Sequence, residues 1–293
     1  MSQRLDGRIL CGTGGFYYVE HAAGILECRA RGVFRREGLT PLAGDLVRFS
    51  VVGEAQGTLE EILPRRNFLV RPPVANVGCL VVVVSLLQPA PNWQVIDSMI
   101  AIAEDRAIPV VIAVNKSDLT DAEPVRALYE GAGFEVFVVS ATEGTGLDPL
   151  KDRLRGEISV FTGNSGVGKS SLLNALDMNL QLPTAAISDK LGRGRHTTRT
   201  SVLYPQADGG YLVDTPGFSS LDMEKAAGID PENLPYCFRE FEPYLGACKF
   251  RSCRHGSELG CAVRAAVEQG KIAPSRYQSY LAMREQAEMA AKY

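Results

Sequence analysis

The sequence has no apolar run long enough to cross a membrane. Its longest run, residues 77–87, ends at Gln88-Pro89, well short of the roughly 18–20 residues that a spanning helix needs, and it suits a buried parallel strand better. The first residues lack the basic and then apolar layout of a secretory signal. We therefore expect no membrane partner and a reducing cytoplasmic location, where the seven cysteines are thiols or metal ligands.

A large excess of charge of one sign is also absent, because the net charge is only −3. That excludes a uniformly basic surface for nucleic acid. The acidic excess is concentrated in residues 76–150, which leaves either end of the chain free to contact a polyanion. Internal repeats and low-complexity segments are missing too, and 293 residues with 45% hydrophobic content suffice for two or three globular domains.

Residues 1–70 predict a small β-barrel. Short strand-like runs are separated by Gly-rich or Pro-containing breaks, at residues 8–11, 16–19, 24–29, 46–52 and 58–63. About five strands with basic clusters, at Arg29, Arg31, Arg35 and Arg36 and at Arg65, Arg66 and Arg71, fit an OB-like barrel that contacts nucleic acid. A purely structural barrel with solvated arginines is the alternative.

After Pro72-Pro73, which we interpret as a linker, residues 74–222 alternate apolar strands with amphipathic helices. This pattern predicts an α/β domain with a mainly parallel sheet, which binds ligands at the carboxyl ends of its strands. Strands are expected at 79–85, 109–114, 134–140 and 158–161, a hairpin at 201–213, and helices at 93–106, 121–131 and 147–155. Residues 223–293 predict a separate Cys- and Pro-containing α-helical domain, with helices near 259–269 and 274–291.

A phosphate-binding loop follows the expected strand at 158–161 and opens a helix. Backbone N–H groups of such a loop surround the β-phosphate, Lys169 reaches the β- and γ-phosphate oxygens, and the Ser170 hydroxyl binds Mg²⁺. The residues expected to contact nucleotide here are Gly163, Asn164, Ser165, Gly166, Val167, Gly168, Lys169, Ser170 and Ser171.

Two further segments match the γ-phosphate side of such a site. Asp214-Thr215-Pro216-Gly217 follows a strand, and it offers a carboxylate near Mg²⁺ and a glycine N–H that faces the γ-phosphate. The polar, Gly-rich run at 192–199 suits a switch loop whose threonine completes the Mg²⁺ shell when triphosphate is bound. We favour Thr198 over Thr197 for that ligand.

The base-reading residues identify guanine. Asn115, Lys116, Ser117 and Asp118 end one strand, and Ser140-Ala141 end the next. The Asp118 carboxylate accepts from guanine N1–H and its 2-amino group, which adenine does not present, and the Lys116 stem covers the ring. A backbone N–H at Ser140-Ala141 donates to guanine O6. Taken alone, Asn-Lys-Ser-Asp also fits a solvated loop, but four motifs at four strand ends favour a GTP site.

These base-reading segments precede the phosphate-binding loop, whereas an ordinary G domain has the reverse order. A parallel sheet tolerates such a circular permutation, because new termini leave the same strand ends together. The chain then leaves the G domain just after residues 214–217. We hypothesise that the C-terminal domain responds to, or controls, the nucleotide state.

Phe218 stands where Ras-like enzymes have a glutamine that orients the attacking water. Because phenylalanine cannot do so, we expect slow intrinsic hydrolysis that a partner accelerates. His196 is the nearby side chain best suited to position water, and an exposed loop histidine or a phosphate contact is the alternative.

Four metal-binding side chains gather near the C-terminus: Cys248, Cys253, His255 and Cys261. Three thiolates and one imidazole suit a tetrahedral Zn²⁺ with no open position, hence a structural site. Reduced buried thiols beside a surface histidine are the alternative. Lys249, Arg251 and Arg254 interleave with these ligands, an arrangement suited to phosphate backbones or simply to solvent.

Motif order and content together resemble the bacterial ribosome-small-subunit-dependent GTPases, the RsgA family, over essentially the whole chain. The resemblance implies an OB-fold at 1–70, a circularly permuted GTPase domain at 74–222 and a zinc domain at 223–293. It further implies a GTP hydrolase that binds the 30S subunit during late subunit maturation and is stimulated by that subunit. We expect contact with 16S rRNA and a monomeric protein. Phe218 also matches the GTPases with a hydrophobic residue in place of the catalytic glutamine.

Other functions remain open at this point. A P-loop ATPase or kinase gives no reason for Asp118, and a GTPase for tRNA modification or metal delivery does not need both barrel and zinc domain. A GTPase acting on another RNA, or an RNA-binding module with little catalysis, keeps all three parts. Lys169 and Ser170 argue for catalysis.

Overall fold

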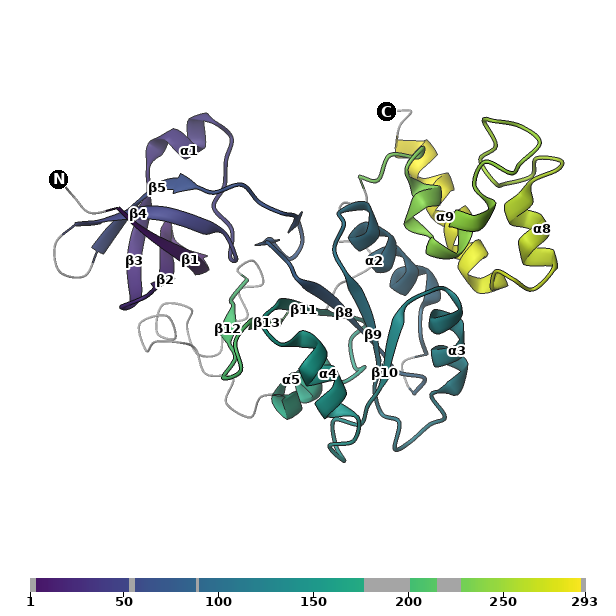
Figure 1. Cartoon of the computed structure of the whole chain (residues 1–293), viewed down its shortest axis with the longest axis horizontal. Coiled ribbons are helices and arrows are strands. Elements are labelled where there is room, and N and C mark those ends of the chain that lie inside the picture. Colours follow the sequence, from purple (N-terminus) through teal and green to yellow (C-terminus); the bar gives the residue numbers. More distant parts are fainter. Residues whose placement is uncertain (1–3, 53–55, 88–89, 177–200, 215–227, 291–293) are drawn as a thin grey trace. The chain divides into compact units, whose positions relative to one another are not determined.

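The computed structural model describes residues 4–52, 56–87, 90–176, 201–214 and 228–290 (Figure 1). The chain divides into two compact units, one of residues 1–79, 153–160 and 176–216, the other of residues 80–152, 161–175 and 217–293. No helix within the described residues is long and apolar enough to span a membrane.

The N-terminal strands close into a five-stranded barrel in the order β1-β2-β3-β5-β4. Its strands are β1 (Arg4–Thr13), β2 (Phe16–His21), β3 (Gly24–Ala30), β4 (Leu46–Val52) and β5 (Gln56–Ile62), and a short helix α1 (Gly32–Arg36) follows β3. Alternation directs one face of each strand inward, so Val47 and Phe49 are fully buried beside Ile9 and Leu59. The predicted OB-like barrel is confirmed.

Pro72 and Pro73 do not form an open linker, contrary to the sequence-based interpretation. They lie in the turn of a hairpin between β6 (Phe68–Leu69) and β7 (Val74–Ala75). The hairpin contacts the barrel, since the Ala75 N–H donates to the Ala43 carbonyl at 2.8 Å. Such a short element depends on tertiary contacts that periodicity does not reveal.

The α/β part contains a six-stranded sheet in the order β10-β9-β8-β11-β13-β12. Parallel pairing joins β8 to β9 and β9 to β10, and β12 pairs antiparallel with β13. Every residue of β8 and β9 is buried, as expected for central parallel strands. The elements are β8 (Cys79–Val84), α2 (Trp93–Asp105), β9 (Val110–Val114), α3 (Glu123–Gly131), β10 (Glu135–Val138), α4 (Leu147–Leu154), β11 (Ile158–Thr162), α5 (Lys169–Leu176), β12 (Tyr204–Pro205) and β13 (Tyr211–Asp214).

The C-terminal module packs onto α2. It comprises two short 3₁₀ helices, η1 (Leu234–Cys237) and η2 (Arg239–Tyr244), followed by α8 (Ala262–Glu268) and α9 (Pro274–Ala290). The Arg276 guanidinium, 1% exposed, lies 2.7 Å from Asp97 of α2 and 2.7 Å from Glu240 of η2. This buried ion network joins the C-terminal module to the sheet's helical layer.

Candidate nucleotide and metal sites

The phosphate-binding loop joins β11 to α5, as predicted. Gly163 has φ +142°, and a Cβ there would lie 2.3 Å from the Val83 carbonyl oxygen, so only glycine fits. The Lys169 side chain curls back over the loop, and its Nζ donates to the carbonyls of Gly163 at 2.8 Å and Asn164 at 2.9 Å. Its amine is therefore held inside the loop, whereas Ser170 and Ser171 are exposed.

Asn115 joins three of the predicted segments. Its side-chain amide donates to the Val167 carbonyl at 3.0 Å, and its side-chain oxygen accepts from the Ala141 N–H at 3.1 Å. The residue is 2% exposed, so both bonds are shielded from water. A Cβ on Gly168 would come within 2.4 Å of this amide nitrogen, which explains the glycine.

Lys116 makes a second connection to the phosphate-binding loop. Its Nζ donates to the Gly166 carbonyl at 2.8 Å, and its backbone has φ +66°, which is uncommon outside glycine. Ser117 is held by its N–H bond to the Val139 carbonyl at 3.2 Å. Asp118 is exposed beside these residues, so its carboxylate is available to a ligand.

Ser140-Ala141 forms a tight loop after β10. Ser140 is fully buried, its backbone N–H donates to Thr145 at 3.0 Å, and its hydroxyl accepts from the Glu143 N–H at 3.1 Å. The loop backbone is thus fixed beside Asn115. The structure brings the two base-reading segments and the phosphate-binding loop together through hydrogen bonds.

The γ-phosphate side is only partly described. Asp214 is the last residue of β13, as the sequence predicted for a carboxylate at a strand end. Thr197, Thr198, His196, Gly217 and Phe218 lie outside the described residues, so their roles stay predictions.

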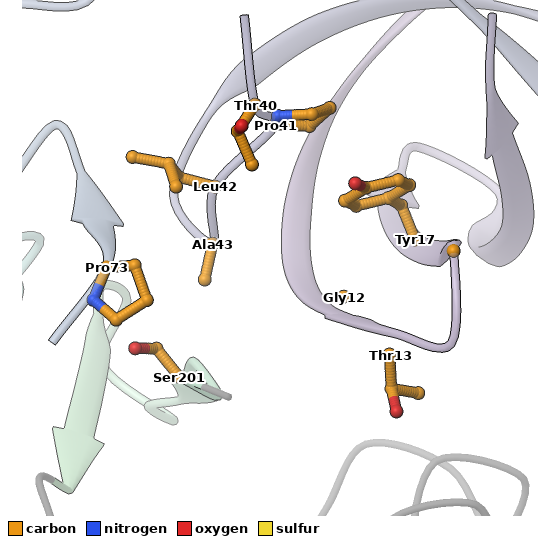
Figure 2. A pocket seen from close by; sticks show the side chains of 10 residues that line it. Gly12, Thr13, Tyr17, Thr40, Pro41, Leu42, Ala43, Pro73 and Ser201 are labelled. Carbon is orange, nitrogen blue, oxygen red and sulfur yellow. The ribbon is translucent and has the colours of Figure 1, made fainter. Parts of the chain in front are cut away.

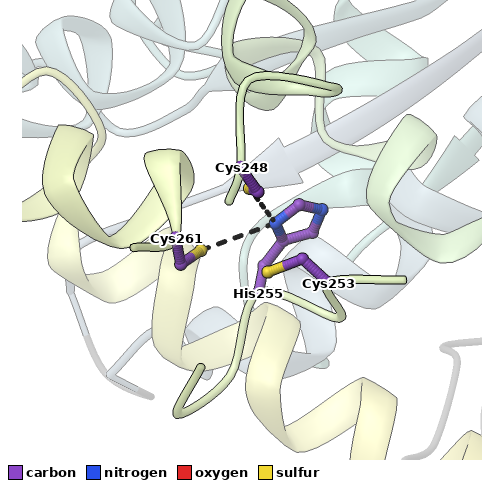
Figure 3. A group of neighbouring side chains, drawn as sticks. All are labelled: Cys248, Cys253, His255 and Cys261. Carbon is purple, nitrogen blue, oxygen red and sulfur yellow. Dashed lines mark hydrogen bonds between the residues drawn. The ribbon is translucent and has the colours of Figure 1, made fainter. Parts of the chain in front are cut away.

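The metal-binding quartet assembles as the spacing predicted (Figure 3). The ligand atoms of Cys248, Cys253, His255 and Cys261 all lie within 4.8 Å of one another. Nδ1 of His255 is 3.5 Å from the Cys248 sulfur and 3.6 Å from the Cys261 sulfur. A tetrahedron with metal–sulfur bonds of about 2.3 Å and a metal–nitrogen bond of about 2.0 Å has edges of roughly 3.5–3.8 Å. The cluster therefore fits zinc in both ligand type and size.

The pKa shifts of the ligands show which of them must lose a proton to bind a metal. Burial raises the pKa of the Cys253 and Cys261 thiols and lowers that of His255. The neutral imidazole is ready to bind a metal, while the thiols must lose protons to it. Two backbone N–H groups support the sulfurs, from Ala262 to Cys248 at 3.3 Å and from Arg264 to Cys261 at 3.5 Å.

Sequence reasoning missed the residues that hold the His255 loop. The Tyr277 hydroxyl donates to the His255 carbonyl at 2.8 Å, and the Tyr280 hydroxyl donates to the Arg254 carbonyl at 2.7 Å. Glu258 closes the loop by accepting from the N–H groups of Arg254 at 2.9 Å and Gly256 at 2.7 Å. His255 can consequently keep its unusual φ of +56°. Tyr277 and Tyr280 are three residues apart on α9 and share one face, the one signal that could have revealed them.

The fold and the site together identify a class of protein. A phosphate-binding loop that follows, rather than precedes, the guanine-reading segments in one sheet is the arrangement of a circularly permuted GTPase.

The comparisons with known proteins agree over nearly the whole chain. The RsgA N-terminal domain matches residues 6–59, and the RsgA GTPase matches residues 62–224. Two small ribosomal subunit biogenesis GTPases RsgA are similar, from Caldanaerobacter subterraneus subsp. tengcongensis (45% identical, covering 96% of this chain and 95% of that protein) and Geobacillus thermodenitrificans (47%, 94% and 95%).

Solved structures agree as well. YjeQ from Thermotoga maritima superposes with a TM-score of 0.81 at 35% identity, covering 97% of this chain and 99% of that one. YloQ, a circularly permuted GTPase, gives 0.79 at 33% identity, with 98% and 96% covered. The chain belongs to the RsgA GTPase family, and it is a GTP hydrolase. The predicted fold class, family and enzyme activity are confirmed.

Proposed function

We propose that this protein binds the 30S ribosomal subunit and acts in its late maturation, hydrolysing GTP to GDP and phosphate with stimulation by the subunit. The observation that carries the proposal is the extent of the likeness: barrel, permuted GTPase domain and Cys₃His module all fall within the 94–96% of the chain that aligns with relatives named for small ribosomal subunit biogenesis. A partial match would support only the nucleotide site.

The sequence motifs and, for the described residues, the site geometry support these nucleotide roles. The loop Gly163–Ser171 holds the phosphates, with Lys169 Nζ leaving its carbonyl partners for the β- and γ-phosphate oxygens and Ser170 binding Mg²⁺. Asp118 reads guanine and the Ser140-Ala141 loop reads its O6, while Asn115, which accepts from the Ala141 N–H, aligns the two halves of the site. Asp214, Thr198 and Gly217 serve the Mg²⁺ and γ-phosphate side.

Hydrolysis needs a partner because Phe218 cannot orient water. We propose His196 as the group that positions the attacking water once the bound subunit orders the site. We propose Zn²⁺ for the Cys248, Cys253, His255 and Cys261 cluster, with a structural role, since four protein ligands leave no position for substrate.

Contact with 16S rRNA is supported by two surfaces. Beside the metal cluster, a pocket of about 490 Å³ is lined by Tyr236 and Phe250, which are 71% and 48% exposed, and by Arg251 and Arg254. Aromatic and guanidinium groups together suit unpaired bases and phosphates. On the barrel, the exposed Arg29 lies 4.7 Å over the Phe16 ring.

Part of the predicted basic surface is structural instead. Arg65 is bound to the fully buried Asp45 at 2.7 Å, and Arg31 pairs with Glu60 at 2.7 Å. Arg65 stabilises the barrel and Arg31 already has an acidic partner, so we assign rRNA contact to the exposed Arg29 and Arg36 instead. We also propose that the protein acts in the cytoplasm, as a monomer.

Subunit binding in each nucleotide state tests the proposal. The purified protein should sediment with 30S subunits in the presence of a non-hydrolysable GTP analogue and release them with GDP, because the triphosphate state orders the switch. It should not sediment with 50S subunits. Equal binding to both subunits, or to unrelated structured RNA, would favour a GTPase acting on another RNA.

A further inference from the structure

The β12–β13 hairpin belongs to the same compact unit as the barrel. The segment that leads into β12 lies against β1: the Leu203 N–H donates to the Leu10 carbonyl at 2.9 Å. Val202 is buried with Cys11 and Tyr18 of the barrel, and Tyr204 packs against the same cluster. The hairpin is thus attached to the barrel by both a backbone bond and a small core.

A polar contact holds the second strand of the hairpin. The Tyr211 hydroxyl donates to the Glu20 carboxylate of β2, and the Arg8 guanidinium lies 5.2 Å above the Tyr211 ring. Burial and the bond to Glu20 raise the pKa of Tyr211 to about 12, so the phenol stays a donor at neutral pH. This contact ties together residues 191 positions apart in the sequence.

The same junction borders a pocket of about 220 Å³ (Figure 2). Gly12 and Thr13, where β1 turns into β2, line it together with Leu42, Ala43 and Ser201. Figure 2 shows Ser201 near Pro73 of the β6–β7 hairpin. The turn that leads into β2 and the start of the hairpin segment therefore share one cavity.

We propose that Glu20 and Tyr211 are positioning residues that pass subunit binding at the barrel to the carboxylate-bearing strand β13. Tyr211 opens the four-residue strand that ends at Asp214. A displacement of β1 and β2 by a bound polyanion moves Tyr211 with them, and an extended strand transmits that shift over three residues to Asp214. The inference rests on the proposed function, because it explains how the subunit stimulates hydrolysis.

Coupling of this kind has a defined size. Two sites that bias one element typically change each other's equilibria by about 5- to 150-fold. Removing the Tyr211–Glu20 bond should leave each site intact and remove the connection between them. The affinity for the subunit and the intrinsic rate of hydrolysis should then stay the same, while the stimulation of hydrolysis by the subunit falls.

The test uses the full-length protein and three variants, Tyr211→Phe, Glu20→Leu and the double variant. Tyr211→Phe keeps the ring beneath Arg8 and removes the donor, and Glu20→Leu removes the acceptor. The matched control is Glu61→Leu, which removes the 2.8 Å pair with Arg48 on the β4–β5 surface and leaves the hairpin contact alone. Hydrolysis is measured without subunits and at saturating 30S, along with the affinity for 30S and the thermal midpoint.

Whether 30S subunits stimulate hydrolysis by the wild-type protein tests the proposed function separately. If the stimulation is present, we expect both single variants to lose at least about 5-fold of it, with intrinsic rate and subunit affinity within about 2-fold of wild type. The double variant should be no worse than either single one, because both substitutions break the same bond. Full stimulation in either single variant overturns the inference, and so does an equal fall in intrinsic and stimulated rates, which marks a merely structural role.

Discussion

Asp118 is the residue on which base selection depends. Its carboxylate is exposed next to Lys116 and Ser117. The Lys116 amine donates to the Gly166 carbonyl and the Ser117 N–H to the Val139 carbonyl, so both residues are fixed. Carboxylate oxygens only accept hydrogen bonds, and guanine presents two N–H donors on one edge. Guanine preference should therefore follow this one side chain.

Asp118→Asn should lower GTP affinity by about 10- to 100-fold, since one donor–donor clash replaces a charge-assisted bond. The amide instead suits xanthine, which carries a carbonyl where guanine has its amino group. Competition of GTP, XTP and ATP for binding measures the change. Unaltered preference for GTP would mean that another residue reads the base.

The cysteines fall into two groups with different chemistry. Burial raises the pKa of Cys11 and Cys28, inside the barrel, to about 12, which leaves roughly one thiolate in ten thousand at pH 8. The metal-cluster cysteines are held by a cation when it is bound. Their reactivity should therefore depend on metal, and that of the barrel thiols should not.

Chelation should make Cys248 and Cys253, which are partly exposed, react with iodoacetamide, while the fully buried Cys11 and Cys28 stay unlabelled. Peptide mass spectrometry at pH 8, before and after treatment with a zinc chelator, reports each site separately. Restored zinc should protect Cys248 and Cys253 again. Equal labelling of these cysteines with and without the chelator would argue against a metal at this cluster.

Among the elements, α9 does most to position the C-terminal module. Its Arg276 contacts Asp97, which also accepts from the Tyr129 hydroxyl at 3.0 Å, and it lies 4.8 Å over the Phe238 ring. Removing one member of a buried ion network leaves the others charged without a partner. The interface between α9 and α2 should depend strongly on this side chain.

Arg276→Met should lower the free energy of unfolding by about 3–5 kcal/mol, because Asp97 and Glu240 lose their counter-charge. The control is Arg264→Gln on α8, which removes a more exposed pair with Glu268 at 3.7 Å and should cost less than about 0.5 kcal/mol. Urea unfolding followed by circular dichroism compares them. Equal midpoints for both variants would contradict the network's role.

Long elements were predictable because their patterns are repetitive. Strand β4 has the bounds expected from its alternation, and α2 and α9 begin at the expected Trp93 and Pro274. Helix α1, the β6–β7 hairpin and the 3₁₀ helices were not foreseen, because such short elements are fixed by contacts with distant parts of the chain. Strand β12 is also shorter than the run from residue 201 indicated.

The candidate site was predictable as a set of motifs but not as a network. Asn115 was expected at the base, yet its partners Ala141 and Val167 are 26 and 52 residues away. The four metal ligands were found from their spacing, whereas Tyr277 and Glu258, which hold the His255 loop, carry no metal-binding signature. Contacts that join separate segments cannot be derived from local patterns.

For the whole molecule, motif order was the most informative signal. Base-reading segments before the phosphate-binding loop indicated the permutation, and the Asn115 hydrogen bonds join these segments in the structure. The earlier hypothesis that the C-terminal domain follows the nucleotide state stays a prediction. Its described contacts include Arg276 with Asp97 and Arg239 with Glu104 and the Gly133 carbonyl, all on the base-reading half of the chain.

The central claim is that the 30S subunit activates this GTPase, and hydrolysis rates with and without subunits test it most directly. We predict a large stimulation by 30S subunits that Lys169→Ala abolishes, since that variant loses the amine held in the phosphate-binding loop. A 50S preparation serves as the control for added RNA. A wild-type rate that is indifferent to 30S subunits would keep the nucleotide site and contradict the ribosomal role.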